Sequence, residues 1–312
     1  MTLQPVGSDS KSTSVEIRNL SRTFGSKKAL DDVSLTVPSG TVFGIVGENG
    51  AGKTTLLRHI LGSLRPQRGS VRVLGMNPIT DLHNVLSRLG YLSASPELPG
   101  WMRVEQLIAY TRPFYPTWDD AYAAELVEMF DIHGRAKVKT LSTGQGARVG
   151  LLLALAHRPE LLILDEPSSG LDPVVRRDIL EAIIESISRA GSTVVFSSHL
   201  LDEVERVSEY VAMVQKGRLL ECESLEAMKG SFRGLTLSFE QPLSQSPSYP
   251  EAIHWHGGGR EWTCMCRNVP ADVTEQVTMI GGQIVEERVP SLDEIFLAYA
   301  SGSAPRSIGT IP

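Results

Sequence analysis

Short apolar segments recur along the chain, separated by polar or glycine-rich segments. Thr41–Val46, Leu161–Leu164 and Thr193–Phe196 contain no charged residue, which is typical of strands buried on both faces of a parallel sheet. In Val104–Tyr110 and Trp118–Phe130, apolar residues instead recur at spacings of three and four, which indicates amphipathic helices. The pattern therefore predicts buried strands that alternate with helices.

The first part of the chain predicts further elements around these segments. We expect strands within Val15–Val46, a helix at Gly52–Leu64 and a strand at Val71–Leu74. The helical region also concentrates aromatic side chains, most of which we expect in the core. They are Trp101, Tyr110, Phe114, Tyr115, Trp118 and Tyr122. An exposed patch around Trp101 would instead favour docking of another protein.

The composition changes after Leu220. Gln241–Pro250 is rich in proline, serine and glutamine, which predicts a linker at a domain boundary. Alternating residues then flank three consecutive glycines, which predicts a hairpin with its turn at Gly257–Gly259. The other elements expected here are a helix from Ala271, a strand at Ile284 and a capped helix at Ser291–Phe296.

These changes divide the chain into successive parts. We expect a disordered tail at residues 1–14, a first domain at 15–230 with a helical insert at about 95–145, an α+β accessory domain at 231–300 and a flexible tail at 301–312. The first tail is polar and rich in serine, so it lacks the basic start and the apolar core of a signal peptide.

Composition is that of a globular protein of the cytoplasm. The chain has 312 residues, a formal net charge of −6 and only three cysteines, too few for a disulfide scaffold. No apolar run approaches the roughly 20 residues that span a bilayer. The mildly acidic charge also gives no broad electrostatic footprint for nucleic acid. A membrane component, if the protein needs one, must therefore be another polypeptide.

The most informative segment is the phosphate loop, Gly47–Thr54, which reads Gly-Glu-Asn-Gly-Ala-Gly-Lys-Thr and joins an apolar strand to a helix. In this context the glycines let backbone N–H groups surround an anion, and the helix N-terminus adds positive potential. Lys53 would reach the terminal phosphates and Thr54 would bind Mg²⁺. The residues expected to bind the nucleotide here are Gly47, Asn49, Gly50, Ala51, Gly52, Lys53, Thr54 and Thr55.

Two carboxylates end the apolar strand Leu161–Leu164. Asp165 would orient the Mg²⁺ ion together with Thr54, and Glu166 would act as the general base that activates water. The alternative is an acidic helix cap, with Pro167 at the first helical position. That alternative does not explain why two acids terminate an otherwise uncharged strand.

A third motif, the signature segment Leu141–Gln145, precedes an apolar helix. Ser142 is predicted to cap that helix, and with Gly144 and free backbone donors it forms a second anion site on a different helix. A single nucleotide does not need two such sites.

In order and spacing, these motifs resemble the ATP-binding cassette (ABC) family over about residues 14–230. The resemblance rests on Gly47–Thr54, Leu141–Gln145, Leu161–Glu166, Ser168–Asp172 and His199. It implies an α/β P-loop NTPase fold with a RecA-like core, a β subdomain and a helical subdomain, to which the small C-terminal α+β extension is added. Two cassettes would pack head to tail, so that the phosphate loop of one and the signature segment of the other enclose the same ATP.

The resemblance also assigns individual residues. Phe24 matches the aromatic position that stacks on adenine, and Asp172 matches the loop that couples the two cassettes. Ser142, Gly144 and Gln145 would contact the ATP of the opposite copy. His199 matches the histidine at the γ-phosphate, although a lone histidine at a strand end is more often structural.

Two residues depart from the pattern of the family. Ala94 stands where the family usually has a glutamine, and alanine can neither bind Mg²⁺ nor orient water. Either Ser95 or Glu97 substitutes, or the metal keeps an additional water. Thr143 replaces the common glycine, which a first-turn helical position tolerates unless its φ must be positive.

A zinc site is a further hypothesis, because His254, His256, Cys264 and Cys266 are all suitable ligands. A tight turn at Gly257–Gly259 would pair both histidines with other residues and leave the cysteines too far along the ladder. We therefore expect ordinary strand residues here.

These expectations combine into a function. The chain is expected to be an ATP-hydrolysing subunit with Glu166, His199 and Lys53 as catalytic residues, ATP and Mg²⁺ as cofactors, and Thr54 and Asp165 as the metal ligands. It would work as a homodimer or with a similar cassette, on the cytoplasmic face of the membrane, bound to a separate permease of export type. An ABC ATPase that acts on ribosomes or DNA is the alternative, but no sustained heptad run separates Lys53 from Ser142.

Overall fold

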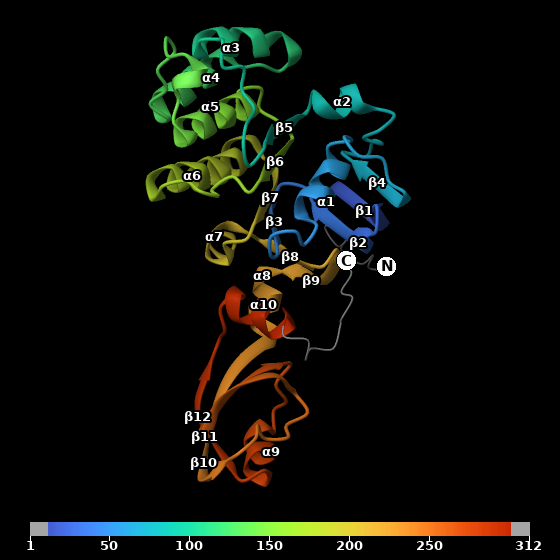
Figure 1. The fold of residues 1–312 in the computed structure, drawn as a ribbon, viewed down its shortest axis with the longest axis vertical. Helices are drawn as coiled ribbons and strands as arrows, with labels where there is room; N and C mark the ends of the chain where they lie inside the picture. Colours follow the sequence, from blue (N-terminus) through green and yellow to red (C-terminus); the bar gives the residue numbers. More distant parts are fainter. Residues whose placement is uncertain (1–11, 301–312) are drawn as a thin grey trace, which may run out of the picture.

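The computed structural model describes residues 12–300, and its centre is a six-stranded sheet (Figure 1). The strand order is β5-β6-β7-β3-β8-β9, parallel from β5 to β8, with β9 antiparallel at the edge. Parallel strands bring the loops after β3, β6 and β7 to one edge of the sheet. The strands are β3 (Val42–Val46), β5 (Leu89–Leu92), β6 (Leu161–Asp165), β7 (Thr193–Ser198), β8 (Tyr210–Gln215) and β9 (Arg218–Ser224).

An antiparallel sheet of β2 (Lys27–Pro38), β1 (Thr13–Phe24) and β4 (Arg68–Val73) lies beside the central sheet. Helix α1 (Lys53–Ile60) is shorter at both ends than the predicted helix, and its apolar residues belong to one buried cluster with residues of both sheets. Packing of α1 in this shared cluster holds the helix close to the end of β3, so that the phosphate loop connects the two.

The boundary of the first tail was predicted two residues too late. Thr13 and Ser14 belong to β1, and the Ser14 hydroxyl lies 2.7 Å from that of Thr193 and 2.8 Å from that of Ser39. Residues 1–11 of that tail, and the whole tail at 301–312, lie outside the described residues.

The helical segment after β5 has both of the helices that were predicted at Val104–Tyr110 and Trp118–Phe130. It contains α3 (Val104–Thr111), α4 (Asp120–Met129) and α5 (Thr143–Leu155), after the short α2 (Leu82–Leu86) and before α6 (Pro173–Ala190). The expectation that most of its aromatic side chains are in the core is wrong. Tyr122 is buried, but Trp101, Tyr110 and Phe114 are 76%, 58% and 60% exposed.

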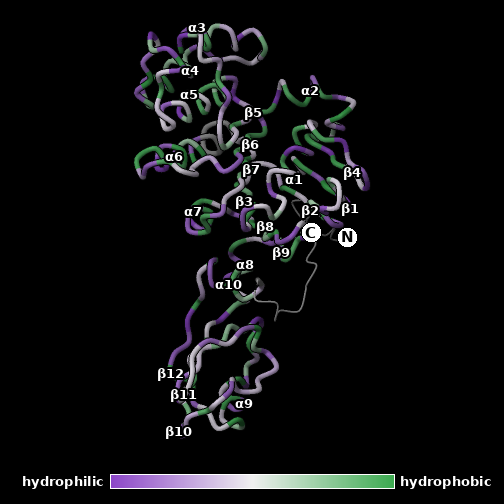
Figure 2. The backbone as a smooth tube through the Cα atoms, in the orientation of Figure 1, coloured by the Kyte–Doolittle hydropathy of each residue, from purple (hydrophilic) through white to green (hydrophobic). Residues whose placement is uncertain are grey.

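The last part of the chain, here called the C-terminal module (Phe232–Ala300), has its own antiparallel sheet. β10 (Phe232–Leu243) is central, between β11 (Ala252–Arg267) and β12 (Gly282–Arg288), and α9 (Val273–Met279) and α10 (Leu292–Ala300) complete it. In Figure 1 this sheet extends away from the central sheet, with α8 (Leu225–Ser231) and α10 at the junction. Figure 2 shows β12 as mostly hydrophilic, which suits an edge strand because charged edges resist pairing with other chains.

The predicted linker and the predicted hairpin turn are both wrong. β10 continues to Leu243 and β11 begins at Ala252, so the predicted linker holds a strand end and the connection of a hairpin within one sheet. β11 runs through the three glycines without a turn. Its register shifts between Glu261, opposite Ser238, and Gly259, opposite Leu243. Gly257 and Gly259 have φ of +123° and +64° there, conformations that glycine adopts without strain.

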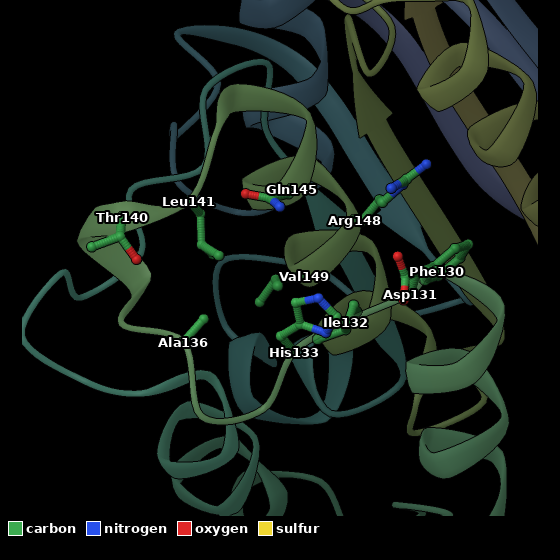
Figure 3. Close-up of a pocket in the computed structure, with 10 residues that line it drawn as sticks. All are labelled: Phe130, Asp131, Ile132, His133, Ala136, Thr140, Leu141, Gln145, Arg148 and Val149. Carbon is green, nitrogen blue, oxygen red and sulfur yellow. The ribbon is translucent and has the colours of Figure 1, made fainter.

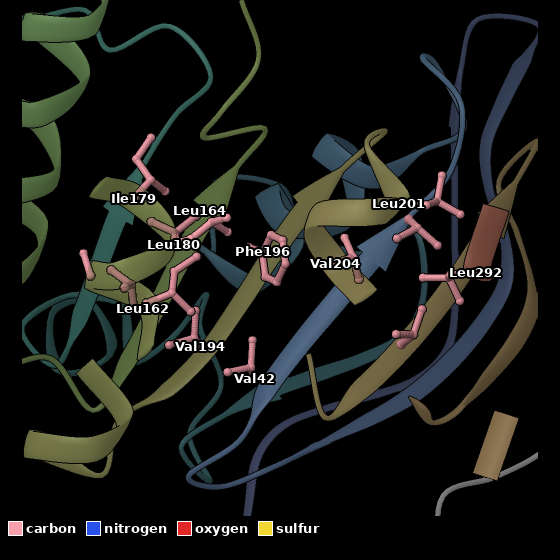
Figure 4. Packing of buried hydrophobic residues seen from close by; sticks show 14 of the residues in the cluster. Val42, Leu162, Leu164, Ile179, Leu180, Val194, Phe196, Leu201, Val204 and Leu292 are labelled. Carbon is pink, nitrogen blue, oxygen red and sulfur yellow. The ribbon is translucent and has the colours of Figure 1, made fainter. Parts of the chain in front are cut away.

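The C-terminal module and the central sheet share one hydrophobic core. Helix α7 (Leu201–Val207) contributes Leu201 and Val204 to the same buried cluster as Phe196 on β7 and Leu292 on α10 (Figure 4). The assignment of residues 231–300 as a separate domain stays a prediction. Among residues 12–300, no helix combines the length and the apolar character needed to cross a bilayer.

Candidate functional site

The phosphate loop lies between β3 and α1, as predicted. Two of its glycines lie where a side chain would clash with the backbone. A Cβ on Gly47 would lie 2.1 Å from the carbonyl oxygen of Val214, and a Cβ on Gly52 would lie 2.6 Å from the carbonyl oxygen of Ala29. Lys53 is buried, and its Nζ donates to the carbonyl oxygens of Gly47 at 2.6 Å and of Glu48 at 3.2 Å. The loop therefore curves around the ammonium group.

The two predicted metal ligands contact each other. Thr54 follows the loop and donates its hydroxyl to Oδ1 of Asp165 over 3.1 Å. Asp165 ends β6 opposite Ser197 of β7, and the Ser197 hydroxyl donates to the same oxygen at 2.7 Å. Hydroxyl and carboxylate oxygens are the ligands that Mg²⁺ prefers. The donor set therefore fits the ion that the sequence predicts.

Glu166 lies at the centre of the site. Its carboxylate is 2.9 Å from Lys53 Nζ and 2.6 Å from His199 Nδ1. Burial alone would raise the pKa of this carboxyl, but the contacts from Lys53 and His199 outweigh burial and hold the pKa below its ordinary value. Glu166 is therefore a carboxylate at neutral pH, as a general base must be.

The backbone of Glu166 is in an unusual conformation. Its φ is +49°, which is costly for a residue with a Cβ and is maintained only by surrounding contacts. The N–H of Glu166 donates to both the hydroxyl and the carbonyl oxygen of Ser197, at 3.0 and 3.1 Å. The helix-cap alternative is excluded because the next helix, α6, begins only at Pro173.

His199 was predicted from the family resemblance alone, and the structure brings it to the site. Its backbone N–H and its Nδ1 both face Oε2 of Glu166, at 3.3 and 2.6 Å. With Nδ1 bound to the carboxylate, Nε2 is the ring nitrogen that can bind a further group.

The signature segment forms the predicted cap of α5. The Ser142 hydroxyl accepts the N–H of Gln145 at 3.2 Å, and the Gln145 side chain accepts the N–H of Ser142 at 2.9 Å. Thr143 is the first residue of α5 and has no positive φ, so the sequence tolerates it as expected. A Cβ on Gly144 would meet a methyl group of Val175 at 2.9 Å, which explains the glycine by packing against α6.

The structure does not bring this segment to the phosphate loop of the same chain. Within residues 12–300, no hydrogen bond or ion pair joins Ser142, Gly144 or Gln145 to Lys53, Thr54 or Glu166. The nearer neighbour of the segment is Asp172, whose carboxylate caps α6 by accepting the N–H groups of Val174 and Val175 at 3.0 and 3.1 Å. Within one chain, the two predicted anion sites are therefore separate.

The remaining predicted nucleotide contacts differ in exposure. Phe24, at the end of β1, is 44% exposed, and the guanidinium of Arg22 lies 4.7 Å from the centre of its ring. Asn49 and Gly50 are exposed, Ala51 is buried, and Thr55 is half-buried with its carbonyl oxygen 2.8 Å from the ring of His59.

The position of the missing glutamine is exposed. Ala94, Ser95 and Glu97 follow β5 at the surface. In the part of the chain that the structure describes, none of them makes a hydrogen bond or an ion pair with Thr54 or Asp165.

Sequence reasoning missed two residues that support the site. Ser197 bonds both Asp165 and Glu166, and Glu203 on α7 accepts the hydroxyl of Ser168, just after the acidic pair. The available signal was the polar end of an otherwise apolar strand, Ser197-Ser198-His199. Recognising it requires knowing that β7 lies next to β6.

A cavity of about 200 Å³ lies beside the signature segment (Figure 3). Leu141, Gln145, Arg148 and Val149 line one part of it, and the loop after α4 lines another. It is smaller than the roughly 300–1,000 Å³ typical of small-molecule sites, so we assign no ligand to it.

The zinc hypothesis gains no support. No group of at least three His, Cys, Asp or Glu side chains within residues 12–300 is arranged to hold a metal ion. Cys264 and Cys266 are buried in the core of the C-terminal module, with their sulfur atoms 3.5 Å apart. All four candidate ligands lie on β11.

Two family descriptions match parts of the chain, and one curated relative matches most of it. Residues 30–169 match the family described as "ABC transporter", and residues 137–204 match an AAA domain described as a putative AbiEii toxin of a type IV TA system. The chain is 32% identical to the uncharacterized ABC transporter ATP-binding protein YhaQ of Bacillus subtilis, over 90% of this chain and 96% of that protein.

Two further similarities concern a named transporter and a solved structure. The chain is 31% identical to the bacitracin transport ATP-binding protein BcrA of Bacillus licheniformis, over 67% of this chain and 69% of that protein. A solved structure of an ATP-binding subunit of an ABC transporter aligns with a TM-score of 0.65 and 25% identity, over 70% of this chain and 92% of that one.

Proposed function

Because this chain belongs to the ABC transporter family and is an ATP-binding, ATP-hydrolysing subunit, we propose that two copies enclose two ATP molecules and drive a separate membrane permease. We further propose that the permease works in the direction of export. The name of BcrA supports a role in transport. A further relative, 33% identical over 71% of this chain, is named the daunorubicin resistance ATP-binding protein DrrA3 of Streptomyces coeruleorubidus, and resistance to a drug supports export because it is consistent with removal of the drug from the cell.

The observation that carries the dimer proposal is the separation of the two anion sites. Lys53, Thr54 and Glu166 lie in one cluster, whereas Ser142 and Gly144 cap another helix with no contact to that cluster among residues 12–300. Each site alone leaves part of a triphosphate without donors. A head-to-tail pair supplies both halves to each ATP.

In the proposed reaction, the γ-phosphorus is attacked by water and the bond to the bridging β–γ oxygen breaks, which gives ADP and phosphate. Glu166 accepts the proton of the water, since its contacts keep it ionised. Lys53 would move from Glu166 and the loop carbonyls to the phosphate oxygens. Thr54 and Asp165 would hold Mg²⁺, which supplies charge neutralisation at the phosphates.

His199 would stabilise the γ-phosphate during the same step. Its Nδ1 is held by Glu166 at 2.6 Å, so Nε2 is available to the γ-phosphate. A positioned imidazole that stabilises developing charge contributes without any reorganisation during the reaction.

The proposed permease contact is the exposed aromatic surface of the helical insert. Tyr110 and Phe114 form an edge-to-face pair with ring centres 5.5 Å apart, and Trp101 precedes the same helix, α3. Exposed aromatic side chains are enriched at protein interfaces. Binding through this surface would place the chain on the cytoplasmic face of the membrane.

Mixing two inactive variants tests the shared site. Lys53→Met removes the phosphate-loop cation, and Ser142→Arg blocks the signature segment. In a mixed dimer, the Lys53 of one chain and the Ser142 of the other meet in one intact site, so ATPase activity should return to roughly a quarter of the wild-type rate, because half of the dimers are mixed and each has one of two sites.

Each variant alone is the control and should lose at least about a hundredfold in ATPase rate. If the mixture stays as inactive as the separate variants while both bind a fluorescent ATP analogue, the shared-site proposal is wrong.

A further inference from the structure

Only Leu200 separates His199 from the start of helix α7, so the position of this helix determines where the His199 side chain lies. The short connection is held by the Ser198 hydroxyl, which accepts the N–H of Leu200 at 3.0 Å. The helix spans only Leu201–Val207. A displacement of α7 therefore moves the His199 backbone, which donates to Glu166.

One side of α7 contacts the catalytic half of the molecule. Glu203 is buried, accepts the hydroxyl of Ser168 and lies 3.9 Å from Arg176. Val204 packs on β3 so closely that a Cβ on Gly44 would lie 2.4 Å from its methyl group. There is no space for α7 to approach the sheet further.

The other side of α7 contacts the C-terminal module. Oε2 of Glu205 accepts the N–H of Leu292, the first residue of α10, at 2.9 Å, and Oε1 forms an ion pair with Lys229 of α8. Leu201 and Val204 share a buried cluster with Leu292 (Figure 4), and Ile295 belongs to the same cluster. Glu205 thus joins the helix after His199 to the module.

The module has a second attachment to the central sheet. Arg267 of β11 lies 2.6 Å from Glu221 of β9, and the Tyr299 hydroxyl donates to the same carboxylate at 2.7 Å. Glu221 is 2% exposed and Tyr299 is 6% exposed. β9 pairs with β8, and β8 pairs with β3. This attachment therefore fixes the position of the module relative to β3, the strand that precedes the phosphate loop.

We propose that the C-terminal module positions His199 for ATP hydrolysis through α7, and that Glu205 is the positioning residue at the contact. The module is fixed to β9 at one point and to α7 at the other, so α10 determines how α7 lies relative to the phosphate loop. This inference rests on the ATPase site described above. It assigns to the module an effect on the rate of hydrolysis rather than on ATP binding.

Glu205→Ala in the full chain should lower kcat for ATP by about tenfold, the effect of roughly 1.4 kcal/mol on the barrier, with KM changed less than about twofold. The KM should change little because Phe24, Lys53 and Thr54, which are proposed to bind ATP, do not contact α7. Glu205→Gln should recover most of the rate, since its amide oxygen still accepts the Leu292 N–H. Arg206→Gln, an exposed neighbour on the same helix, is the matched control and should leave kcat unchanged.

A double variant separates positioning from loss of stability. In the His199→Ala background, Glu205→Ala should reduce kcat by less than about twofold further, because the group that it positions is gone. An equal tenfold loss in both backgrounds would overturn the proposal.

A readout independent of turnover is the imidazole NMR signal of His199, one of seven histidines, assigned by its absence in His199→Gln. It should shift in Glu205→Ala and stay in place in Arg206→Gln. An unchanged signal in Glu205→Ala would overturn the proposal. If the wild-type chain hydrolysed no ATP, the proposed function would fail, and the NMR comparison would still decide this inference.

Discussion

At the residue scale, the site depends on a serine that supports both carboxylates. Ser197 donates to Asp165 and accepts the N–H of Glu166, whose φ is +49°. A strained backbone persists only where surrounding contacts hold it. Ser197 therefore keeps Glu166, the proposed general base, and Asp165, the proposed metal ligand, in their relative positions.

Ser197→Ala should lower kcat for ATP by about tenfold to a hundredfold, because a hydrogen bond to a charged group contributes roughly 1.5–3 kcal/mol. Steady-state ATPase assays would measure this. The control is Ser192→Ala, which removes a buried serine just before the other end of the same strand, where it bonds the Pro159 carbonyl oxygen at 2.6 Å. Equal kcat losses in the two variants would contradict the role of Ser197.

The motif residues could be predicted from sequence because they are close together along the chain. The spacing of Lys53 and Thr54 after an apolar strand is sufficient to expect a phosphate loop. Ser197 could not be found in this way, since its contacts depend on the order of β6 and β7 in the sheet. The contact of Lys53 with Glu166 likewise joins residues that only the fold brings together.

At the element scale, the errors occurred where local patterns have more than one structural solution. Three consecutive glycines are compatible with a turn, but β11 uses them to shift its register while it continues along β10. The proline- and serine-rich segment before it resembles a linker, yet it connects two paired strands. The pairing partner decides between these solutions, and local sequence does not specify that partner.

His157 connects elements at the base of the helical insert. Its ring stacks on Tyr115 with centres 3.8 Å apart, and Nε2 lies 3.2 Å from the carbonyl oxygen of Leu89 at the start of β5. Burial lowers the pKa of His157 from 6.5 to about 4. The folded protein therefore favours the neutral ring, and protonation favours unfolding.

Stability should accordingly fall as the pH falls from 6.5 towards 4, because the unfolded state binds the proton first. The full effect is on the order of 3 kcal/mol. Urea midpoints measured across this range would test it. His157→Phe keeps a ring against Tyr115 but does not titrate, so its midpoint should depend less on pH. An identical pH dependence in both proteins would show that His157 is not the group responsible.

At the scale of the whole molecule, the chain presents separate surfaces for separate tasks. The nucleotide site lies at one edge of the central sheet, the helical insert exposes Trp101 and Tyr110, and the C-terminal module extends from the side of β9 (Figure 1). The motifs allowed the nucleotide site and the helical insert to be predicted from the sequence. The attachments of the module to β9 and α7 involve residues far apart in the sequence, so only the fold reveals them.

The double variant Trp101→Ser and Phe114→Ser should abolish recovery of the chain with membranes while leaving its ATPase activity without the permease unchanged, since neither residue contacts the site. Flotation of membranes from cells that express the complete transporter would measure this. Met279→Ser is the control, because Met279 is 80% exposed but lies on α9. If the double variant still floats with membranes as the control does, the permease docks elsewhere.

The contact between β9 and the C-terminal module also limits which chimeras of such proteins can fold. Glu221 on β9 is 2% exposed, and its carboxylate lies 2.6 Å from the guanidinium of Arg267 on β11. A chimera with a foreign module that lacks a cation at this point would leave an uncompensated buried charge, which costs about 3–5 kcal/mol. Exchanges between relatives should therefore transfer the acid and the base together.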